Sequence, residues 1–461
     1  MIARFRFGIL IATAVLSGCQ SGYRDAAKKI DGHLLAGDMQ GAAEVANGAF
    51  LAKKNERDAV VRAMDAGVTL LFAGRLQESS VALEDAYTRV RPLLDTNAEI
   101  SLTENVGAIG ANQTVMVYEG TPVERTMLNT FQAISKLAQG GYDEARVEFN
   151  RANEWQKDAV ERYAKAIQSA RQRAAKQAQS KGIDLAAASQ SSDFSSLTTG
   201  LEDASAYASF QSPLTSYLRA IFLLSTSREA GDLGNARSEL RSVYEMVPSA
   251  RGVIEADLKQ IDDGKFEPTT WVLVMSGMCP RRDEIRIDIP IPVGEVNYVS
   301  AAFPKLRSVD GNVDRYSIAT ADGVADTVEL MNVESVVKAE FREALPAIIA
   351  QEIASSVAKA AATYALSNSS RDDTANLIGK IVGIAYQAST TQADLRSWRT
   401  LPKTIQVARA STPEDGKISV NAGDGQTIQV PVAADRFNVL LVWQPGGSGT
   451  PISMIQWSMN P

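Results

Sequence analysis

The chain has 461 residues, of which 45% are hydrophobic, and a formal net charge of −7. This length allows two or more packed cores. An acidic chain without long basic blocks argues against nucleic acid as a partner. The sequence holds two cysteines and a single histidine, His33. Multi-histidine metal sites and histidine-based catalytic triads are therefore excluded, and we expect no metal and no other cofactor.

The first eighteen residues have the features of a secretory signal. Arg4 and Arg6 precede an uncharged stretch over residues 8–16, which is too short to span a bilayer. The tetrapeptide Leu16-Ser-Gly-Cys19 that follows resembles the lipobox of bacterial lipoproteins, in which the cysteine is acylated. We expect residues 1–18 to be removed and Cys19 to carry the lipid, palmitate included. The alternative is an ordinary cleaved signal with a chance cysteine.

The residue after the cysteine indicates a location. Gln20 stands where lipoproteins retained in the inner membrane of many Gram-negative bacteria have aspartate, so the resemblance implies the periplasmic face of the outer membrane. Several acyl chains on Cys19 give stable anchoring where a single chain does not. Because Cys19 is then used for the lipid, Cys279 has no partner for an intrachain disulfide, and stability must come from burial.

Residues 19–265 are expected to form an all-α unit. From residue 25 onward apolar residues recur three and four apart, which is typical of helices. Residues 128–152 resemble a tetratricopeptide (TPR) repeat, with a glycine turn between two helices that pack through small residues. The matching positions are Ala133, Gly140, Tyr142, Ala145, Phe149 and Ala152. Similar windows begin at Gly37, Gly74 and Gly231, and a polar segment near 183–205 is expected to be a disordered loop.

Stacked helical repeats of this kind form a superhelix with a concave groove that binds peptides or partner helices. Tyr142 and Trp155 are candidate groove contacts, although an aromatic residue at helical spacing is more often part of the core. The alternative is that the helical array only lifts the second domain away from the membrane.

Residues 266–461 are expected to form a β-sandwich-like domain with an inserted helical hairpin, which makes the chain a multidomain α+β protein. Glu284 to Ile291 alternates apolar and polar residues, as in a half-buried strand, and turn signals such as Asp310-Gly311 separate further candidates. The predicted strands are 271–275, 284–291, 298–303, 314–320, 327–331, 404–408, 417–421, 427–432, 438–443 and 453–457. The hairpin spans 334–389, with helices over about 334–366 and 374–389.

Four segments of this half, 271–274, 277–284, 298–306 and above all 392–409, carry a family resemblance. The motif Ala393-Asp394-Leu-Arg396-Ser-Trp398-Arg-Thr-Leu-Pro402 is the most specific part. These segments resemble a widespread, uncharacterised family of proteobacterial lipoproteins that join TPR-like repeats to such a domain. The resemblance implies gene neighbours that are small activators of penicillin-binding proteins, and hence a cell-wall role. It assigns no catalytic residue.

Asp394, Arg396, Trp398 and Arg399 form the main candidate site, because they concentrate charge and an aromatic ring before a predicted buried strand. One interpretation is a binding surface for a peptide or glycan. The other is structural: Asp394 pairs with Arg396 or Arg409 and braces the loop, while Trp398 packs on the helical hairpin.

Three functions are compatible with these features. We expect a scaffold that is not an enzyme and binds another envelope protein, of unknown oligomeric state. The first alternative is a glycan hydrolase using a carboxylate pair such as Asp322 and Asp326. The second is a structural subunit of an envelope oligomer assembled through the hairpin. Cys279 lies beside Arg281 and Arg282, yet it lacks a histidine base and is not a convincing nucleophile.

Overall fold

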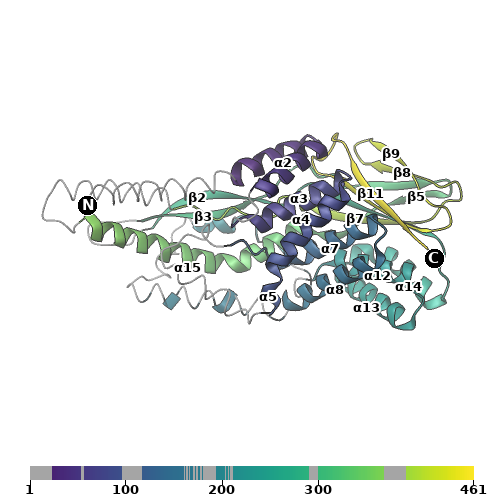
Figure 1. The fold of residues 1–461 in the computed structure, drawn as a ribbon, viewed down its shortest axis with the longest axis horizontal. Coiled ribbons are helices and arrows are strands. Elements are labelled where there is room, and N and C mark those ends of the chain that lie inside the picture. Colours follow the sequence, from purple (N-terminus) through teal and green to yellow (C-terminus); the bar gives the residue numbers. More distant parts are fainter. Residues whose placement is uncertain are drawn as a thin grey trace.

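The computed structural model shows an α+β fold with helices in the N-terminal half and strands in the C-terminal half, as the sequence predicts (Figure 1). It describes residues 23–52, 57–95, 117–159, 194–202, 211–289, 299–367 and 391–460, with single positions between 161 and 207. The signal segment, Cys19 and the second predicted helix of the hairpin, 374–389, lie outside the described residues.

The helical half is built from consecutive helices joined by short turns, which makes neighbours antiparallel. Three-residue connections join α3 to α4, α7 to α8 and α12 to α13. After a helix over residues 23–35, the elements are α2 (Met39–Ala52), α3 (Ala59–Phe72), α4 (Leu76–Val90), α5 (Pro92–Asp95), α7 (Pro122–Ala138), α8 (Tyr142–Asp158), α11 (Ser195–Thr198), α12 (Pro213–Thr226), α13 (Ala230–Met246), the 3₁₀ turn η6 (Pro248–Ala250) and α14 (Arg251–Asp263).

Glycine turns separate two of these pairs. Gly74 and Gly140 have φ angles of +78° and +79°, a left-handed conformation that glycine adopts without strain. The third turn differs from our expectation, because Gly231 lies inside the first turn of α13. The chain reverses instead at residues 227–229, where the backbone N–H of Ser227 still donates to Leu223.

The first helix of each pair is buried on all sides. All 14 residues of α3, 14 of the 17 in α7 and 12 of the 14 in α12 are buried. The second helices bury only one face, since 7 of 15 residues in α4, 6 of 17 in α8 and 3 of 17 in α13 are buried. We call the side formed by α3, α7 and α12 the inner face of the helical layer, and the side formed by α4, α8 and α13 its outer face.

A five-stranded sheet covers the inner face, in the order β11-β10-β1-β7-β6, with only the β1–β10 pair parallel. A four-stranded sheet, β5-β4-β8-β9, and a two-stranded ribbon, β2–β3, complete the strands. The strands are β1 (Thr269–Ser276), β2 (Arg281–Ile289), β3 (Val299–Arg307), β4 (Tyr316–Thr320), β5 (Gly323–Asp326), β6 (Val328–Asn332), β7 (Thr404–Ser411), β8 (Lys417–Ala422), β9 (Thr427–Pro431), β10 (Phe437–Gln444) and β11 (Ser453–Met459).

Burial of strand β1 on both faces explains why its sequence is continuously apolar rather than alternating. Trp271 and Leu273 face the helices and belong to the largest buried cluster, whereas Val272 and Val274 face the four-stranded sheet. A strand buried on both faces has no solvent side and needs no polar residues. The five-stranded sheet is therefore the middle layer between the helices and the second sheet.

The β2–β3 ribbon packs on α15 (Val333–Ser367), and the two elements project together from the body (Figure 1). Phe341, Leu345, Ile353 and Val357 of the predicted apolar stripe lie in this cluster, so the first hairpin helix forms as expected. The expectation of a disordered loop over 183–205 is wrong for residues 194–202. These residues include α11 and bury Phe194, Leu197 and Leu201 in the same cluster.

The helical and sheet halves meet at Gly37, which allows a direct test of their contact. Gly37 has a φ of +71°, and a Cβ placed there would lie 2.4 Å from Cδ of Pro451 and 2.9 Å from its backbone nitrogen. Gly74 has a similar φ of +78° but no atom within 4 Å. We expect Gly37→Ala to lower the free energy of unfolding, measured in urea, by more than the control Gly74→Ala. The control loses only the ~1–2 kcal/mol that a left-handed backbone costs a residue with a Cβ. Equal losses would contradict a packed junction at this point.

Candidate functional site

The segment 391–402, which carries the predicted site, is inserted between the helical layer and the sheet. Asp394, Arg396, Trp398 and Arg399 are all less than a tenth exposed. The interpretation of these residues as a binding surface is therefore wrong, because no solvent-facing surface is formed by their side chains. They are the centre of a buried polar network.

Arg396 holds the start of the segment through two carboxylates. Its Nε and Nη2 each lie 2.8 Å from Asp394, and its Nη1 lies 3.5 Å from Asp58. Burial raises the pKa of Asp394, but the charge of Arg396, its hydrogen bonds and the charge of Arg282 together outweigh burial and hold that pKa below its usual range. Arg409 takes no part, since its Nε donates to Asp257 of α14 at 2.8 Å. Of the two pairings considered for Asp394, the structure shows the one with Arg396.

Arg399 ties the segment to the N-terminal helix over residues 23–35. Its Nη1 contacts Asp31, and Arg281 of β2 contacts the other oxygen of Asp31 at 2.9 Å. The backbone N–H groups of Arg399 and Thr400 donate to Asp65 of α3 at 3.1 and 3.3 Å. One segment therefore joins the N-terminal helix, α3 and the ribbon.

Trp398 anchors the segment on α7. Its indole ring packs edge-on against Phe131, with centroids 5.7 Å apart, and its backbone N–H donates to Glu124 at 2.8 Å. Glu124 also accepts from the Tyr118 hydroxyl at 2.5 Å and from the N–H of Thr121 at 2.9 Å, where it completes the cap of α7. The predicted packing of Trp398 on the hairpin is replaced, among the described residues, by this packing on α7.

Tyr142 and Trp155, the other predicted contacts, are not brought together with this network. Trp155 is buried, and its Nε1 donates to Asn129 at 3.0 Å. Tyr142 is 37% exposed, and its hydroxyl donates to the carbonyl of Ser458 on β11 at 2.8 Å. Trp155 is therefore a core residue, and Tyr142 joins the helical layer to the edge of the sheet.

Sequence reasoning missed the acidic half of the network, Asp31, Asp58, Asp65 and Glu124. A usable signal was present for one of them, Asp65. In α3 the sequence AVVRAMDAGVTLLF places Arg62 and Asp65 in an otherwise apolar helix. Charged residues are rarely fully buried without a partner, so this pair already predicts a buried polar contact from elsewhere in the chain.

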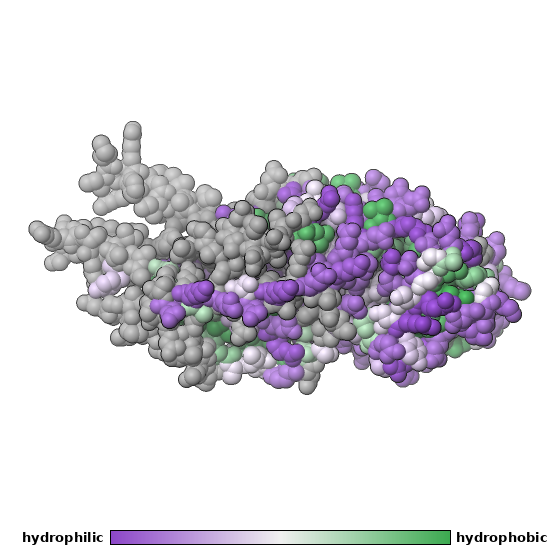
Figure 2. All heavy atoms as spheres, turned by 90° about the horizontal axis from the view of Figure 1, so that it is seen from below, coloured by the Kyte–Doolittle hydropathy of each residue, from purple (hydrophilic) through white to green (hydrophobic). Residues whose placement is uncertain are grey.

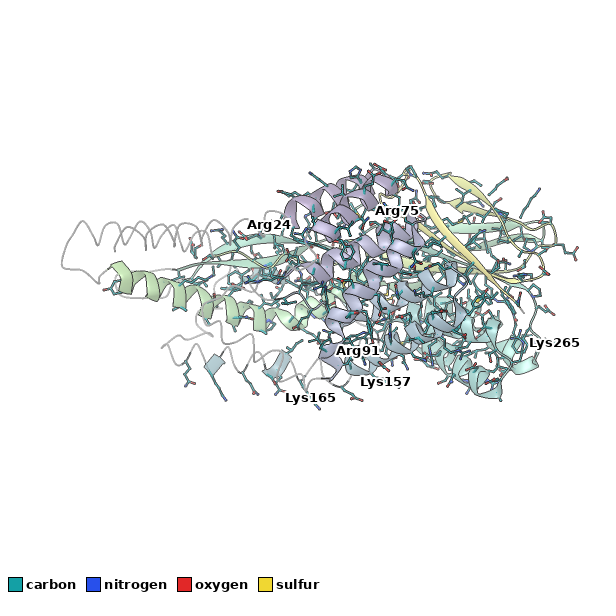
Figure 3. The ribbon with its side chains drawn as sticks, viewed as in Figure 1. Arg24, Arg75, Arg91, Lys157, Lys165 and Lys265 are labelled. Carbon is teal, nitrogen blue, oxygen red and sulfur yellow. The ribbon has the colours of Figure 1, made fainter. Side chains whose placement is uncertain are left out.

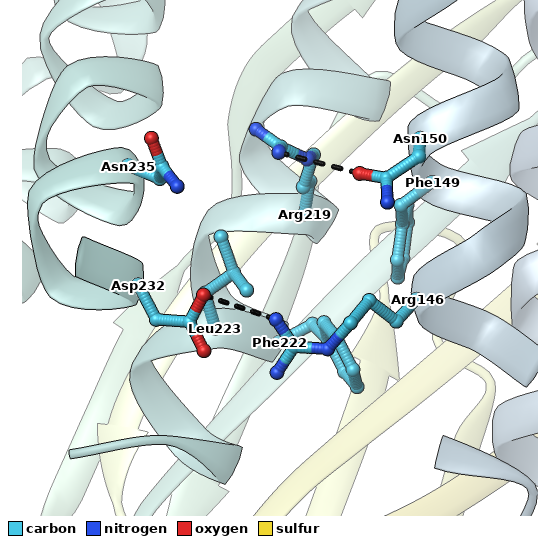
Figure 4. A pocket seen from close by; sticks show the side chains of 8 residues that line it. All are labelled: Arg146, Phe149, Asn150, Arg219, Phe222, Leu223, Asp232 and Asn235. Carbon is cyan, nitrogen blue, oxygen red and sulfur yellow. Dashed lines mark hydrogen bonds and ion pairs between the residues drawn. The ribbon is translucent and has the colours of Figure 1, made fainter. Parts of the chain in front are cut away.

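An open pocket of about 210 Å³ lies on the outer face between α8, α12 and α13 (Figure 4). Its polar side chains come from facing helices, and two buried phenylalanines and a leucine form its apolar wall. The lining residues are Arg146, Phe149, Asn150, Arg219, Phe222, Leu223, Asp232 and Asn235.

The two arginines of the pocket reach into it from different helices (Figure 4). Arg146 donates through Nη1 to Asp232 at 3.0 Å, and Arg219 donates through Nη1 to Glu239 at 2.6 Å. The bond to Arg146 lowers the pKa of Asp232. Each guanidinium has five N–H donors, so both retain donors for a ligand after these bonds. The pocket can hold a small polar or acidic group over an aromatic wall.

The remaining candidate residues, Cys279, Asp322 and Asp326, lie outside the open pocket. Cys279 is buried, and burial raises the pKa of its thiol well above the usual range, although Arg281 acts in the opposite direction. Asp322 is exposed in the β4–β5 turn, and Asp326 is exposed at the end of β5. Within the part of the chain that the structure describes, no group of three or more metal-ligating side chains is placed to hold an ion.

Comparison of the chain with protein family models, with curated proteins and with solved structures gives no match in any of the three. None of the helices in the described ranges combines the length and apolar character needed to cross a membrane.

The Asp31 contacts predict a large loss of stability when this carboxylate is removed. Asp31→Ala leaves Arg281 and Arg399 buried without their shared counter-charge, for which we expect a loss of about 3–5 kcal/mol in the free energy of unfolding. Asp262→Ala, which breaks a half-exposed pair with Arg237, is the control and is expected to cost at most about 1 kcal/mol. Urea denaturation of both variants measures the difference, and similar losses would argue against a structural role for the network.

Asp65 predicts a specific pH dependence of stability. Burial raises its pKa to about 7, against the opposing charges of Arg399 and Arg281. An unfolded aspartate loses its proton near pH ~4, so between about pH 4 and pH 7 the folded state binds the extra proton, and stability falls as the pH rises through this window. Asp65→Asn keeps an acceptor for both N–H groups and removes the titration. We expect the wild-type chain to lose more stability than Asp65→Asn between pH 5 and pH 8, whereas parallel profiles would contradict the assignment.

Proposed function

We propose that this chain is a lipoprotein anchored through Cys19 to the periplasmic face of the outer membrane, and that it is a scaffold that binds another envelope protein. In this proposal the helical half is a TPR-like superhelix and the C-terminal half is β-sandwich-like. The leader sequence and Leu16-Ser-Gly-Cys19 support the anchor. A role in cell-wall assembly rests on the family resemblance alone.

One observation supports a binding place for the partner on the outer face. The groove that TPR-like repeats offer to ligands corresponds to the inner face, and here the chain's own sheet and the segment 391–402 fill it. The open pocket lies on the opposite side, between α8, α12 and α13. We therefore assign partner binding to the outer face and no longer to the groove.

The character of the outer surface agrees with polar recognition. Viewed from the side on which α13 and α14 lie, the described surface is mostly hydrophilic, and its apolar patches are small and separated (Figure 2). A partner held here contacts guanidinium and amide groups at the pocket, with Phe149 and Phe222 behind them. Such interfaces depend on a few well-placed groups rather than on the total area of contact.

The glycan hydrolase alternative gains no support from this pocket. Glycosidases place two carboxyl groups about 5–10 Å apart around the scissile bond. Among the residues that line the pocket, Asp232 is the one carboxylate, and it is paired with Arg146.

Site-specific photo-cross-linking in intact cells tests the proposal. We expect a photoreactive residue at Asn235 to form a reproducible adduct with another envelope protein, while the same residue at Glu245, exposed on the same helix but about 15 Å away along its axis, forms none. Arg146→Ala and Arg219→Ala should reduce the Asn235 adduct, and Arg237→Ala should not. An adduct of equal strength at Asn235 and Glu245, or none at either, would count against the pocket.

A further inference from the structure

The N-terminal helix is a fixed part of the body rather than a flexible tether. The Tyr23 side chain is buried, and its hydroxyl donates to the carbonyl of Ser397 at 3.1 Å. Arg24 pairs with Glu284 of β2 at 3.2 Å, and Asp31 pairs with Arg281 and Arg399. The helix is therefore attached at both ends to elements from the C-terminal half of the chain.

The chain between the lipid and this helix is short. Tyr23 is four residues after Cys19, and four residues of fully extended chain span at most ~14 Å. If Cys19 is acylated, as proposed above, the headgroup layer lies within this reach of Tyr23. The fixed body then has little freedom to turn away from the membrane.

The β2–β3 ribbon lies on the same side of the molecule as the start of the N-terminal helix. Arg24 lies beside the ribbon, and the ribbon projects from the body together with α15, whereas Lys265 lies at the opposite end of the molecule (Figure 3). Ile289, at the far end of β2, is five residues beyond Glu284, which corresponds to ~17 Å along the strand. The distance from Arg24 to the far end of the ribbon is therefore similar to the distance that the chain between Tyr23 and the acylated Cys19 can span.

Exposed polar side chains cover this side. Asp25, Lys28 and Lys29 form one exposed polar stripe of the N-terminal helix at helical spacing, which continues at the exposed Gly32. On β2 the isoleucines face α15, while the exposed Arg286 and Asp288 alternate with them. Mixed charges of this kind match a phospholipid headgroup layer, which carries phosphates and ammonium groups, better than they match the hydrocarbon core.

We propose that the headgroup layer of the anchoring leaflet covers this face, formed by the exposed stripe of residues 25–32 and the polar side of β2. The inference rests on the proposed acylation of Cys19 and goes beyond it, because it assigns the orientation of the body. The ribbon lies at the membrane, and the end that carries Lys265 points into the periplasm.

Fluorescence quenching on vesicles tests this orientation. The lipidated mature chain is placed in vesicles of phosphatidylethanolamine and phosphatidylglycerol that carry a headgroup quencher, with one thiol-reactive dye at Lys28→Cys, Asp288→Cys or the control Lys265→Cys. Labelling is selective because the Cys19 thiol is used for the lipid and Cys279 is buried. Flotation with the vesicles is measured first, so that failure of the anchor is detected separately.

The expected result is strong quenching at positions 28 and 288, severalfold greater than at position 265. Quenching at 28 without quenching at 288 would overturn the proposed orientation while the anchor stands. Equal quenching at all three positions would also overturn it, because it would indicate a body that tumbles on its tether. A chain that does not float with the vesicles would refute the anchor, and the orientation with it.

Discussion

Burial of the charged segment 391–402 is the constraint on which the rest of the structure depends. Arg396 and Arg399 are buried, and a buried guanidinium without a carboxylate costs several kcal/mol. Their partners are in part Asp58 and Asp31, which lie more than 300 residues earlier in the chain. The helical and sheet halves must therefore come together before Arg396 and Arg399 have all of their carboxylate partners. The two halves that differ in periodicity along the sequence share one buried cluster, which runs from Tyr23 to Met459.

The same constraint explains how the helical layer is used. In an open superhelix the first helix of each pair lines a solvent-filled groove, and part of its surface stays exposed. Here α3 has no exposed residue, because α4 covers one side and the sheet covers the other. The ring of Phe72 at the end of α3 lies 5.1 Å from Trp443 of β10, which shows how closely the two layers pack. The inner face is therefore covered within the molecule, which is why the proposed partner is assigned to the outer face.

The sequence predicted most elements and failed where long-range contacts decide the outcome. Each of the ten predicted strands is present, because alternation and short apolar runs are local signals, while the short β5 was missed. Gly231 was misread because turn glycine and helical glycine look alike when the neighbouring helices are unknown. The site residues were found by their unusual concentration of charge. Their burial was not predictable, since Asp65 and Glu124, which accept from the segment's backbone, are far away in the sequence.

The polar residues on the inner face show why a groove with such a lining cannot be assigned to a ligand from sequence alone. Asn129 of α7 accepts from Trp155 at 3.0 Å and donates to Glu148 at 2.7 Å, and Thr130 lies 2.8 Å from Thr215 of α12. These partners come from α8 and α12, so for Asn129 and Thr130 the helices satisfy one another. A buried polar group must have a partner, but the requirement is equally met by a ligand or by the chain itself. The segment 391–402 meets it for Asp65 and Glu124, which accept from the backbone N–H groups of Trp398, Arg399 and Thr400.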